Sequence, residues 1–284
     1  MRTEEKLIFQ ALRERGVAFD RIDTRKLVLD LNLDGHGADK PMQSRGQFDN
    51  YGIVLVRCLS NSRALCASRV LQMQGVRTVN TRDAIATCGD KILTNLALLE
   101  YGIPTPRAAM AFSRESALVG AHDIGYPVVV KPPIGSWGRL MAKVNDRQTA
   151  ESIVEHKEAM DNSGGSPFYV QDYIHKPGYD IRTLVVGDET LYAVRRSSAH
   201  WITNTARGGQ VSNLAVTDEL DRLSLAAAAA VGGEIVAVDI LEDADGVLTV
   251  NEVNHTPEFH GAMQVTDVDI AGKMVDYVLR LADG

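Results

Sequence analysis

The sequence predicts a mixed α/β fold, of the α+β kind, in which three lobes follow one another along the chain. Helix-like and strand-like patterns alternate over the first third, segments rich in glycine and proline interrupt the pattern, and five strand-like runs crowd the last third. A chain of 284 residues is long enough for two or three such lobes. We expect an N-terminal lobe over 1–88, a central lobe over 89–170 and a C-terminal lobe over 171–284.

The N-terminal lobe is predicted to be a βαβ-like unit. Residues 3–15 have a helical pattern, the apolar run 53–57 (IVLVR) is typical of a buried strand, residues 61–74 are helical again, and 77–80 form a short strand. A parallel-sheet lobe of this type normally starts with a strand, whereas this chain opens directly in a helix. A leading strand is therefore a candidate missing element.

The central lobe is predicted to begin with a helix over 90–101, which ends at Gly102 with Pro104 and Pro106 beyond it. A helix, a strand, a glycine loop, a strand and a helix follow at 114–123, 127–131, 135–138, 140–144 and 147–160. Residues 162–167 (NSGGSP) form a loop at the second boundary.

The C-terminal lobe is predicted to hold a mixed sheet covered by helices. Its strands are expected at 168–173, 181–186, 190–196, 235–241 and 247–253. A helix through the alanine run 226–230 can be capped by Thr217 and ended by Gly232 and Gly233.

Composition excludes several classes of function. The net charge of -7 argues against general binding of nucleic acid, which needs a basic face. No run of about 18 apolar residues predicts a membrane span, and the start MRTEEKLIFQ lacks the apolar core of a signal peptide. Three cysteines without a CxxC pair are typical of reduced thiols, so we expect a cytoplasmic protein. The histidines show no zinc spacing, and neither GxSxG nor HExxH occurs.

The segment 128–144 (VVVKPPIGSWGRLMAKV) joins an apolar strand that ends in Lys131 to a loop containing Gly135, Ser136 and Gly138. Glycines let backbone N–H groups approach phosphate oxygens, and a lysine supplies a positive charge. The loop lies between strands and lacks the ending of a P-loop, so it fits a flap over phosphates. Taken alone, the segment fits a plain hairpin with a glycine turn equally well.

The segment 236–254 predicts a metal-binding hairpin. Asp239 lies on the first strand, the turn is expected at Ala244-Asp245, and Glu252 and Asn254 share one face of the return strand. The turn pairs Asp239 with about residue 250, so the three side chains converge as hard oxygen ligands suited to Mg²⁺. The alternative is a solvated polar face, but the flanking Val, Ile and Leu residues indicate burial, which is costly for unpaired carboxylates.

Cations and amides cluster between residues 180 and 210. Asp180 and Arg182 open one strand, Arg195 and Arg196 end another, and Asn204 follows in the run SSAHWITNTARGGQ. The arginine fork suits phosphate and carboxylate oxygens. The alternative is an ordinary surface ion pair with Asp180 or Glu189, which is expected for at least one of these arginines.

Together these segments resemble the ATP-grasp superfamily, and most closely its lysine-biosynthesis ligase for α-aminoadipate and a carrier protein, related to ribosomal-protein glutamate ligases. The resemblance covers nearly the whole chain. It rests on the runs CGDK (88–91), VVVKPPIGSWGRL (128–140), YVQDYI (169–174), PGYDIR (177–182), RRSSAHWITNTARGGQ (195–210), and VAVDI with VNEVNHTPEF.

The resemblance implies a role for each candidate residue. Contacts with ATP are implied for Lys91, Lys131, Gly135, Ser136, Gly138, Gln171, Asp172, Tyr173, Ile174 and Asp180, the hinge 171–174 holding adenine and Asp180 lying near the ribose. The reacting centre would include Arg182, Arg195 and Asn204. Two Mg²⁺ ions would be bound by Asp239, Glu252 and Asn254.

The resemblance also implies the reaction. A carboxylate, the side chain of the C-terminal glutamate of a small acidic amino-group carrier protein, would be activated by ATP as an acyl-phosphate and joined to the amino group of α-aminoadipate. Residues 258–266 (EFHGAMQVT) match neither an aminoadipate-specific nor a glutamate-specific pattern, so the amine partner stays open between α-aminoadipate and glutamate, the latter for arginine biosynthesis or a protein tail. A third hypothesis is an ATP-binding module without turnover. We also expect a homo-oligomer.

Overall fold

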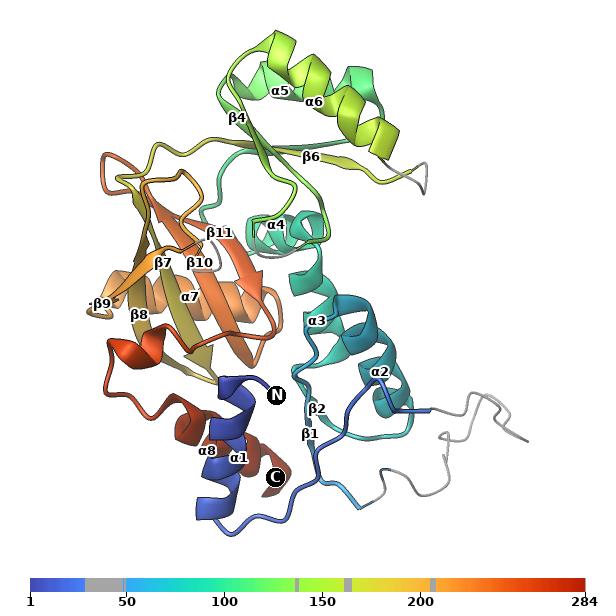
Figure 1. Cartoon of the computed structure of the whole chain (residues 1–284), viewed down its shortest axis with the longest axis vertical. Coiled ribbons are helices and arrows are strands. Elements are labelled where there is room, and N and C mark those ends of the chain that lie inside the picture. The colour runs from blue at the N-terminus through green and yellow to red at the C-terminus, as the bar shows by residue number, and fades with distance from the viewer. Residues whose placement is uncertain (29–47, 49, 136–137, 161–164, 205–207, 284) are drawn as a thin grey trace.

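The fold is described from a computed structural model, which covers residues 1–28, 48, 50–135, 138–160, 165–204 and 208–283 (Figure 1). Its N-terminal part consists of α1 (Thr3–Glu14), β1 (Val54–Leu55), α2 (Asn61–Met73), β2 (Thr78–Val79) and α3 (Arg82–Gly89). β1 and β2 pair in parallel, with Val54 opposite Thr78. The predicted strands and helices are present here, although both strands are shorter than expected and α3 was not predicted.

The middle of the chain forms a four-stranded antiparallel sheet covered on one side by helices (Figure 1). Its elements are α4 (Lys91–Glu100), β3 (Ala108–Ala111), α5 (Arg114–Ile124), β4 (Val128–Lys131), β5 (Ala142–Val144), α6 (Arg147–Met160) and β6 (Phe168–Asp172). The strand order is β3-β6-β4-β5. Asp90 caps α4 by accepting a hydrogen bond from the Ile92 N–H at 2.8 Å, so the chain breaks between α3 and α4.

The last part forms a five-stranded antiparallel sheet in the order β11-β10-β7-β8-β9. Its elements are β7 (Tyr179–Val186), β8 (Glu189–Ser197), β9 (Gln210–Leu214), α7 (Asp218–Ala230), β10 (Ile235–Glu242), β11 (Leu248–Asn254), the 3₁₀ turn η2 (Ala262–Gln264) and α8 (Ile270–Asp283). Thr217 caps α7, and Gly232 just beyond it has a positive φ of 64°, as predicted. The strand expected at 168–173 was placed in the wrong sheet, because as β6 it pairs with β3 and β4 of the middle sheet, and the last sheet is antiparallel where a mixed sheet was expected. The division of the chain at residues 88 and 170 stays a prediction.

The two faces of the five-stranded sheet pack differently. One face carries Ile181, Val185 and Ala193 and packs on α7 and on Leu98 of α4. The other carries Leu184 and Tyr192 and packs on α1 and α8, the helices at the two ends of the chain, which lie side by side in Figure 1. Side chains alternate between faces along a strand, so this second face also carries the polar residues described below.

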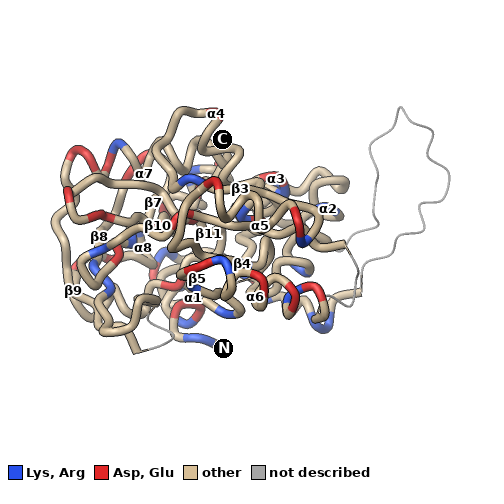
Figure 2. The backbone as a smooth tube through the Cα atoms, turned by 90° about the horizontal axis from the view of Figure 1, so that it is seen from above, with Lys and Arg blue, Asp and Glu red and all other residues tan. Residues whose placement is uncertain are grey.

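Charged residues of both signs are interspersed along the described chain (Figure 2). Among the described residues, no helix combines the length and the apolar character needed to cross a membrane.

Candidate active site

A cleft of about 270 Å³ lies where the three parts of the chain meet. It brings together eight of the residues predicted from sequence: Lys91, Gly135, Gly138, Arg182, Asn204, Asp239, Glu252 and Asn254. Its remaining walls come from the N-terminal part, the loop after β4 and the segment after β11: Cys58, Leu59, Asn61, Cys88, Gly89, Ile134, Arg139, Met141, His255, Thr256 and Glu258.

The β10–β11 hairpin supplies the polar floor of the cleft. Asp239 lies directly opposite Glu252, and Ala237 opposite Asn254, so the three predicted oxygen ligands share one face of the sheet. The expected pairing of Asp239 with residue 250 is displaced by two residues. The turn sets Ile240 opposite Val250, which accounts for one residue, and a β-bulge after Asp239, with Asn251 as the extra residue, accounts for the other.

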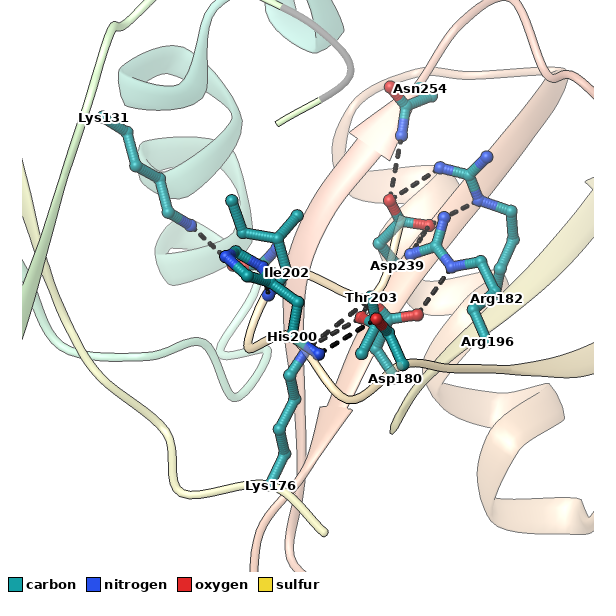
Figure 3. A network of polar contacts seen from close by, with 12 residues as sticks. Lys131, Lys176, Asp180, Arg182, Arg196, His200, Ile202, Thr203, Asp239 and Asn254 are labelled. Carbon is teal, nitrogen blue, oxygen red and sulfur yellow. Dashed lines mark hydrogen bonds and ion pairs between the residues drawn. The ribbon is translucent and has the colours of Figure 1, made fainter. Parts of the chain in front are cut away.

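Asp239 is bound by arginines rather than left unpaired. Arg182 Nε donates to Asp239 Oδ1 at 2.6 Å and Arg182 Nη2 donates to Oδ2 at 2.7 Å, and Arg196 Nη2 lies 3.2 Å from Oδ1 (Figure 3). Burial opposes ionisation of this carboxyl, but the two guanidinium groups outweigh burial and hold the pKa of Asp239 below its ordinary value. The arginines thereby keep it ionised at neutral pH.

A second ion-pair cluster lies behind the first. Asp180 accepts a hydrogen bond from Arg196 Nε at 2.6 Å and another from the Thr203 hydroxyl, and Lys176 Nζ lies 3.8 Å from its other oxygen (Figure 3). Asp180 and Arg196 are both buried. Asp180 does not line the cleft in this structure; it anchors Arg196, which in turn contacts Asp239.

Lys131 is buried and joins the two large sheets. Its ammonium donates to the side-chain oxygen of Gln171 on β6 and, at 2.9 Å, to Asn251 Oδ1 in the bulge of β11. Burial lowers the pKa of Lys131 to about 8, with Glu252 opposing that shift and Lys91 adding to it. An ammonium held by two neutral amide oxygens can exchange them for anionic oxygens.

Lys91 and the loop after β4 close one end of the cleft. Lys91 Nζ donates to Gly135 O at 2.8 Å, and the Lys91 N–H donates to Pro133 O at 2.9 Å. Gly138 has a φ of +63°, which a glycine adopts without strain and which lets the chain turn back toward β5. Ser136 lies outside the described residues.

The predicted hinge connects the two sheets without lining the cleft. Gln171 and Asp172 end β6, and Tyr173 and Ile174 follow before β7 begins. The Tyr173 ring lies under Lys143 Nζ, 3.7 Å from the ring centroid, and makes an edge contact with Trp201. An aromatic and cationic cluster thus packs beside the backbone of this hinge.

Arg195 is not brought to the cluster around Asp239. It lies opposite Ile181, on the sheet face that packs on α7, and its guanidinium sits 4.7 Å from the centre of the Tyr179 ring. The neighbouring Arg196 lies on the polar face and makes the contacts described above. Sequence reasoning missed Arg196, Lys176, Thr203 and Asn251; the doublet Arg195-Arg196 was visible, but only the strand register decides which arginine points inward.

The chemistry of the hairpin fits a hard cation. Glu252 makes no side-chain hydrogen bond or ion pair with any described residue, and Asn254 directs its Nδ2 toward Asp239 at 3.5 Å, which turns its oxygen away. Within the described residues no three His, Cys, Asp or Glu side chains form a metal-binding group. Glu252 and the Asn254 oxygen are thus the groups best placed to hold Mg²⁺, which completes its shell with phosphate oxygens and water. Asp239 would share its oxygens with Arg182 and Arg196.

Comparisons with known proteins agree with this geometry. Residues 88–278 match the model of the RimK-like ATP-grasp domain, and residues 1–87 match the LysX preATP-grasp domain. The chain is 40% identical to "Glutamate--LysW ligase ArgX" of Sulfurisphaera tokodaii, over 98% of this chain and 95% of that protein. It is 31% identical to "Alpha-aminoadipate--LysW ligase LysX" of the same organism, over 99% and 94%.

A solved structure has the same fold. The RimK domain ATP-grasp protein of Sphaerobacter thermophilus superposes with a TM-score of 0.75 at 24% identity, covering 98% of this chain and 96% of that one. Fold, cleft and sequence matches agree, and the resemblance noted from the sequence is confirmed. The chain belongs to the RimK-like ATP-grasp family and is an ATP-using ligase that forms C–N bonds.

Proposed function

We propose that this ligase joins the amino group of glutamate to the side-chain carboxylate of the C-terminal glutamate of a small acidic amino-group carrier protein, in amino-acid biosynthesis. Both relatives named above are LysW ligases by name, which supports a carrier protein as the carboxylate substrate. The observation that carries the proposal is the cleft in which Lys91, Arg182 and the Asp239–Glu252 pair meet.

The choice of glutamate over α-aminoadipate rests on relatedness. The sequence resemblance placed α-aminoadipate first. Two ligases of one organism, compared with this chain over nearly its whole length, give 40% identity for the glutamate enzyme and 31% for the aminoadipate enzyme. We therefore propose glutamate as the amine substrate and keep α-aminoadipate as the second candidate.

The roles of the residues follow from their charges. Lys91 and Lys131 would attract the phosphates of ATP, and the backbone N–H groups around Gly135 and Gly138 would cover them, together with Ser136. The hinge 171–174 would hold adenine, with Asp180 toward the ribose. Asp239, Glu252 and Asn254 would hold Mg²⁺, two ions by family resemblance, which when bound supplies positive charge to the phosphates.

The reaction would proceed in two displacements. A carboxylate oxygen of the carrier attacks the γ-phosphorus, ADP leaves, and an acyl-phosphate results. The uncharged amino group of glutamate then attacks the acyl carbon, the bond to phosphate breaks, and the nitrogen passes one proton to the departing phosphate as the amide forms. Arg182 and Asn204 line the cleft where they can donate hydrogen bonds to the developing negative charge, with Arg195 predicted for this role from sequence only. Arg182 is already fixed by Asp239, so it needs little reorganisation.

Mass spectrometry of the carrier tests this proposal. The purified protein is incubated with carrier, ATP and Mg²⁺, with glutamate in one sample and α-aminoadipate in another. We expect the carrier mass to increase by one glutamyl residue, with α-aminoadipate used less efficiently. A preference for α-aminoadipate would favour the second candidate, and ATP binding without phosphate release under any condition would indicate a module without turnover.

A further inference from the structure

The segment 255–258, directly after β11, forms one wall of the cleft although it has no helical or strand structure. His255, Thr256 and Glu258 line the cleft from this segment, next to Cys58, Leu59 and Asn61 of the N-terminal part. A segment without its own backbone ladder needs contacts from outside to keep one conformation.

Those contacts come from the ends of the two parallel strands. Asn80 Nδ2 donates to His255 O at 2.8 Å, Arg57 Nη2 donates to Pro257 O at 2.9 Å, and Thr256 Oγ1 donates to Cys58 O at 3.4 Å. Arg57 follows β1 and Asn80 follows β2. The N-terminal part therefore sets the position of a wall that belongs to the C-terminal sheet.

Arg57 is the charged member of this set. Its side chain is 10% exposed, and Glu5 of α1 pairs with it at 3.3 Å. Glu5 also pairs with Arg2, which reaches Glu258 on the cleft wall at 3.2 Å. Arg57 Nη1 is buried and has no hydrogen-bond partner among the described residues. Burying a guanidinium with a single carboxylate partner lowers the stability of the fold. Such a cost is consistent with a role for Arg57 in holding the segment 255–258.

We propose that Arg57 is a positioning residue that fixes the 255–258 wall and thereby sets the affinity and the length selectivity for the amine substrate. This inference rests on the proposed function, because it takes the amine to be glutamate or its one-methylene-longer analogue. The residues proposed to bind ATP, Lys91, Lys131 and the flap, lie on other walls of the cleft or behind it. The wall made by 58–61 and 255–258 therefore faces the substrates that are not nucleotides.

The physical reason for selectivity is the rigidity of the wall. A pocket of fixed depth discriminates between two substrates that differ by one methylene by about 10- to 200-fold in kcat/KM. A more mobile wall can move to accommodate the longer side chain of α-aminoadipate. The preference for glutamate over α-aminoadipate then falls together with the affinity for glutamate. A displacement of about 1 Å is enough to change turnover by about 100-fold.

The test compares Arg57→Gln, Arg57→Lys and the control Arg77→Gln. Arg77 precedes β2 in the same part of the chain. Its guanidinium pairs with the partly buried Glu234 at 3.5 Å and donates to Leu281 O at 3.2 Å, and neither partner lines the cleft. For Arg57→Gln we expect KM for glutamate to rise about tenfold, KM for ATP to change less than about twofold, and the ratio of kcat/KM for glutamate over α-aminoadipate to fall about tenfold. Arg57→Lys should lie between it and the parent protein, and Arg77→Gln should match the parent.

A parallel rise of KM for ATP and glutamate, or an unchanged selectivity ratio, would overturn the proposal. Amide hydrogen exchange gives a second readout that needs no substrate. We expect faster exchange at the main-chain amides of residues 255–260 in Arg57→Gln and unchanged exchange over 239–254; unchanged exchange at 255–260 would count against Arg57. If the parent protein ligates neither glutamate nor α-aminoadipate, the proposed function is wrong. The hydrogen-exchange result then tests by itself whether Arg57 holds the segment 255–258 in place.

Discussion

Arg182 binds Asp239 through both arms of its guanidinium group, at 2.6 and 2.7 Å, across the pairing of β7 with β10. This pair neutralises the first carboxylate of the hairpin. Glu252 lies directly opposite Asp239 and, within the described residues, has no ion-pair or hydrogen-bond partner for its side chain. The two carboxylates therefore differ: one is held by arginine, and the other is available to a ligand.

Glu252→Gln should abolish ligation while leaving the fold intact. The substitution keeps the shape of the side chain but removes the charge proposed to hold Mg²⁺. We expect the rate of amino-acid-dependent phosphate release to fall at least about 100-fold with little change in melting temperature. Asp245→Asn, an exposed change in the turn of the same hairpin, is the matched control and should retain the parent rate. Near-normal turnover of Glu252→Gln would refute the metal assignment.

ATP affinity should depend on the charge of Lys131. Burial lowers its pKa to about 8, so the ammonium is charged below that pH and loses its proton above it. The charged groups near it are Glu252, Lys91, Lys176 and Asp239. Because only the charged form attracts phosphate, we expect the Kd for ATP to increase as the pH rises through about 8.

Substitutions of Lys131 separate its charge from other titrations. Lys131→Met should raise the Kd for ATP about tenfold at neutral pH, which is about 1.4 kcal/mol, and should flatten the pH dependence. Lys131→Arg keeps the charge and should also flatten it. The surface substitution Lys273→Met is the control and should leave both properties unchanged, since Lys273 pairs only with Glu189 among the described residues. A pH profile that persists in Lys131→Met would assign it to another group.

The two neighbouring arginines of β8 should contribute very differently to stability. Arg196→Leu leaves Asp180 buried without its main partner, so we expect the free energy of unfolding to fall by about 3–5 kcal/mol. Arg195→Leu removes a contact with the Tyr179 ring and should cost about 1 kcal/mol. Chemical denaturation of both variants measures the difference. Equal losses would contradict the assignment of the two side chains to opposite faces.

Asn80 should be a major anchor between the N-terminal part and the C-terminal sheet. Its buried amide donates to Ile235 O and His255 O and accepts from the N–H groups of Glu234 and Ile235, all at 2.7–2.9 Å. Asn80→Ala leaves these backbone groups without partners, so we expect a loss of about 2–5 kcal/mol in the free energy of unfolding. Asn213→Ala, on the exposed edge strand β9, should cost less than about 1 kcal/mol.

Local patterns predicted most of the regular elements. The apolar run ending at Lys131 and the run 235–241 through Asp239 were correctly predicted as strands, because their composition is typical of buried β structure. β3 was missed because its sequence, AAMA, has no β-branched residue, and its strand structure comes from pairing with β6. α8 was also left unassigned, although its apolar residues recur at helical spacing and pack on α1.

The candidate site was predictable in its residue types and less so in its contacts. Asp239, Glu252 and Asn254 were expected on one face, and they share one. The arginine partners of Asp239 could not be predicted, because they depend on the register of three strands distant in sequence. The sequence could not show which of Arg195 and Arg196 shares the face of Asp239 for the same reason: a shift of one residue along a strand exchanges its faces.

The bulge in β11 should let the hairpin tolerate the loss of one residue, Asn251. Ile240 pairs with Val250 and Asp239 pairs with Glu252, so Asn251 has no partner on β10. Without Asn251, Val250 and Glu252 would be consecutive and would still point to opposite faces. Removing Asn251 would keep Asp239 and Glu252 on the same face of the sheet. It would eliminate Asn251 Oδ1, the hairpin oxygen that Lys131 contacts. Length variation at this point can therefore detach the central sheet's lysine from the hairpin while the hairpin keeps its ligands.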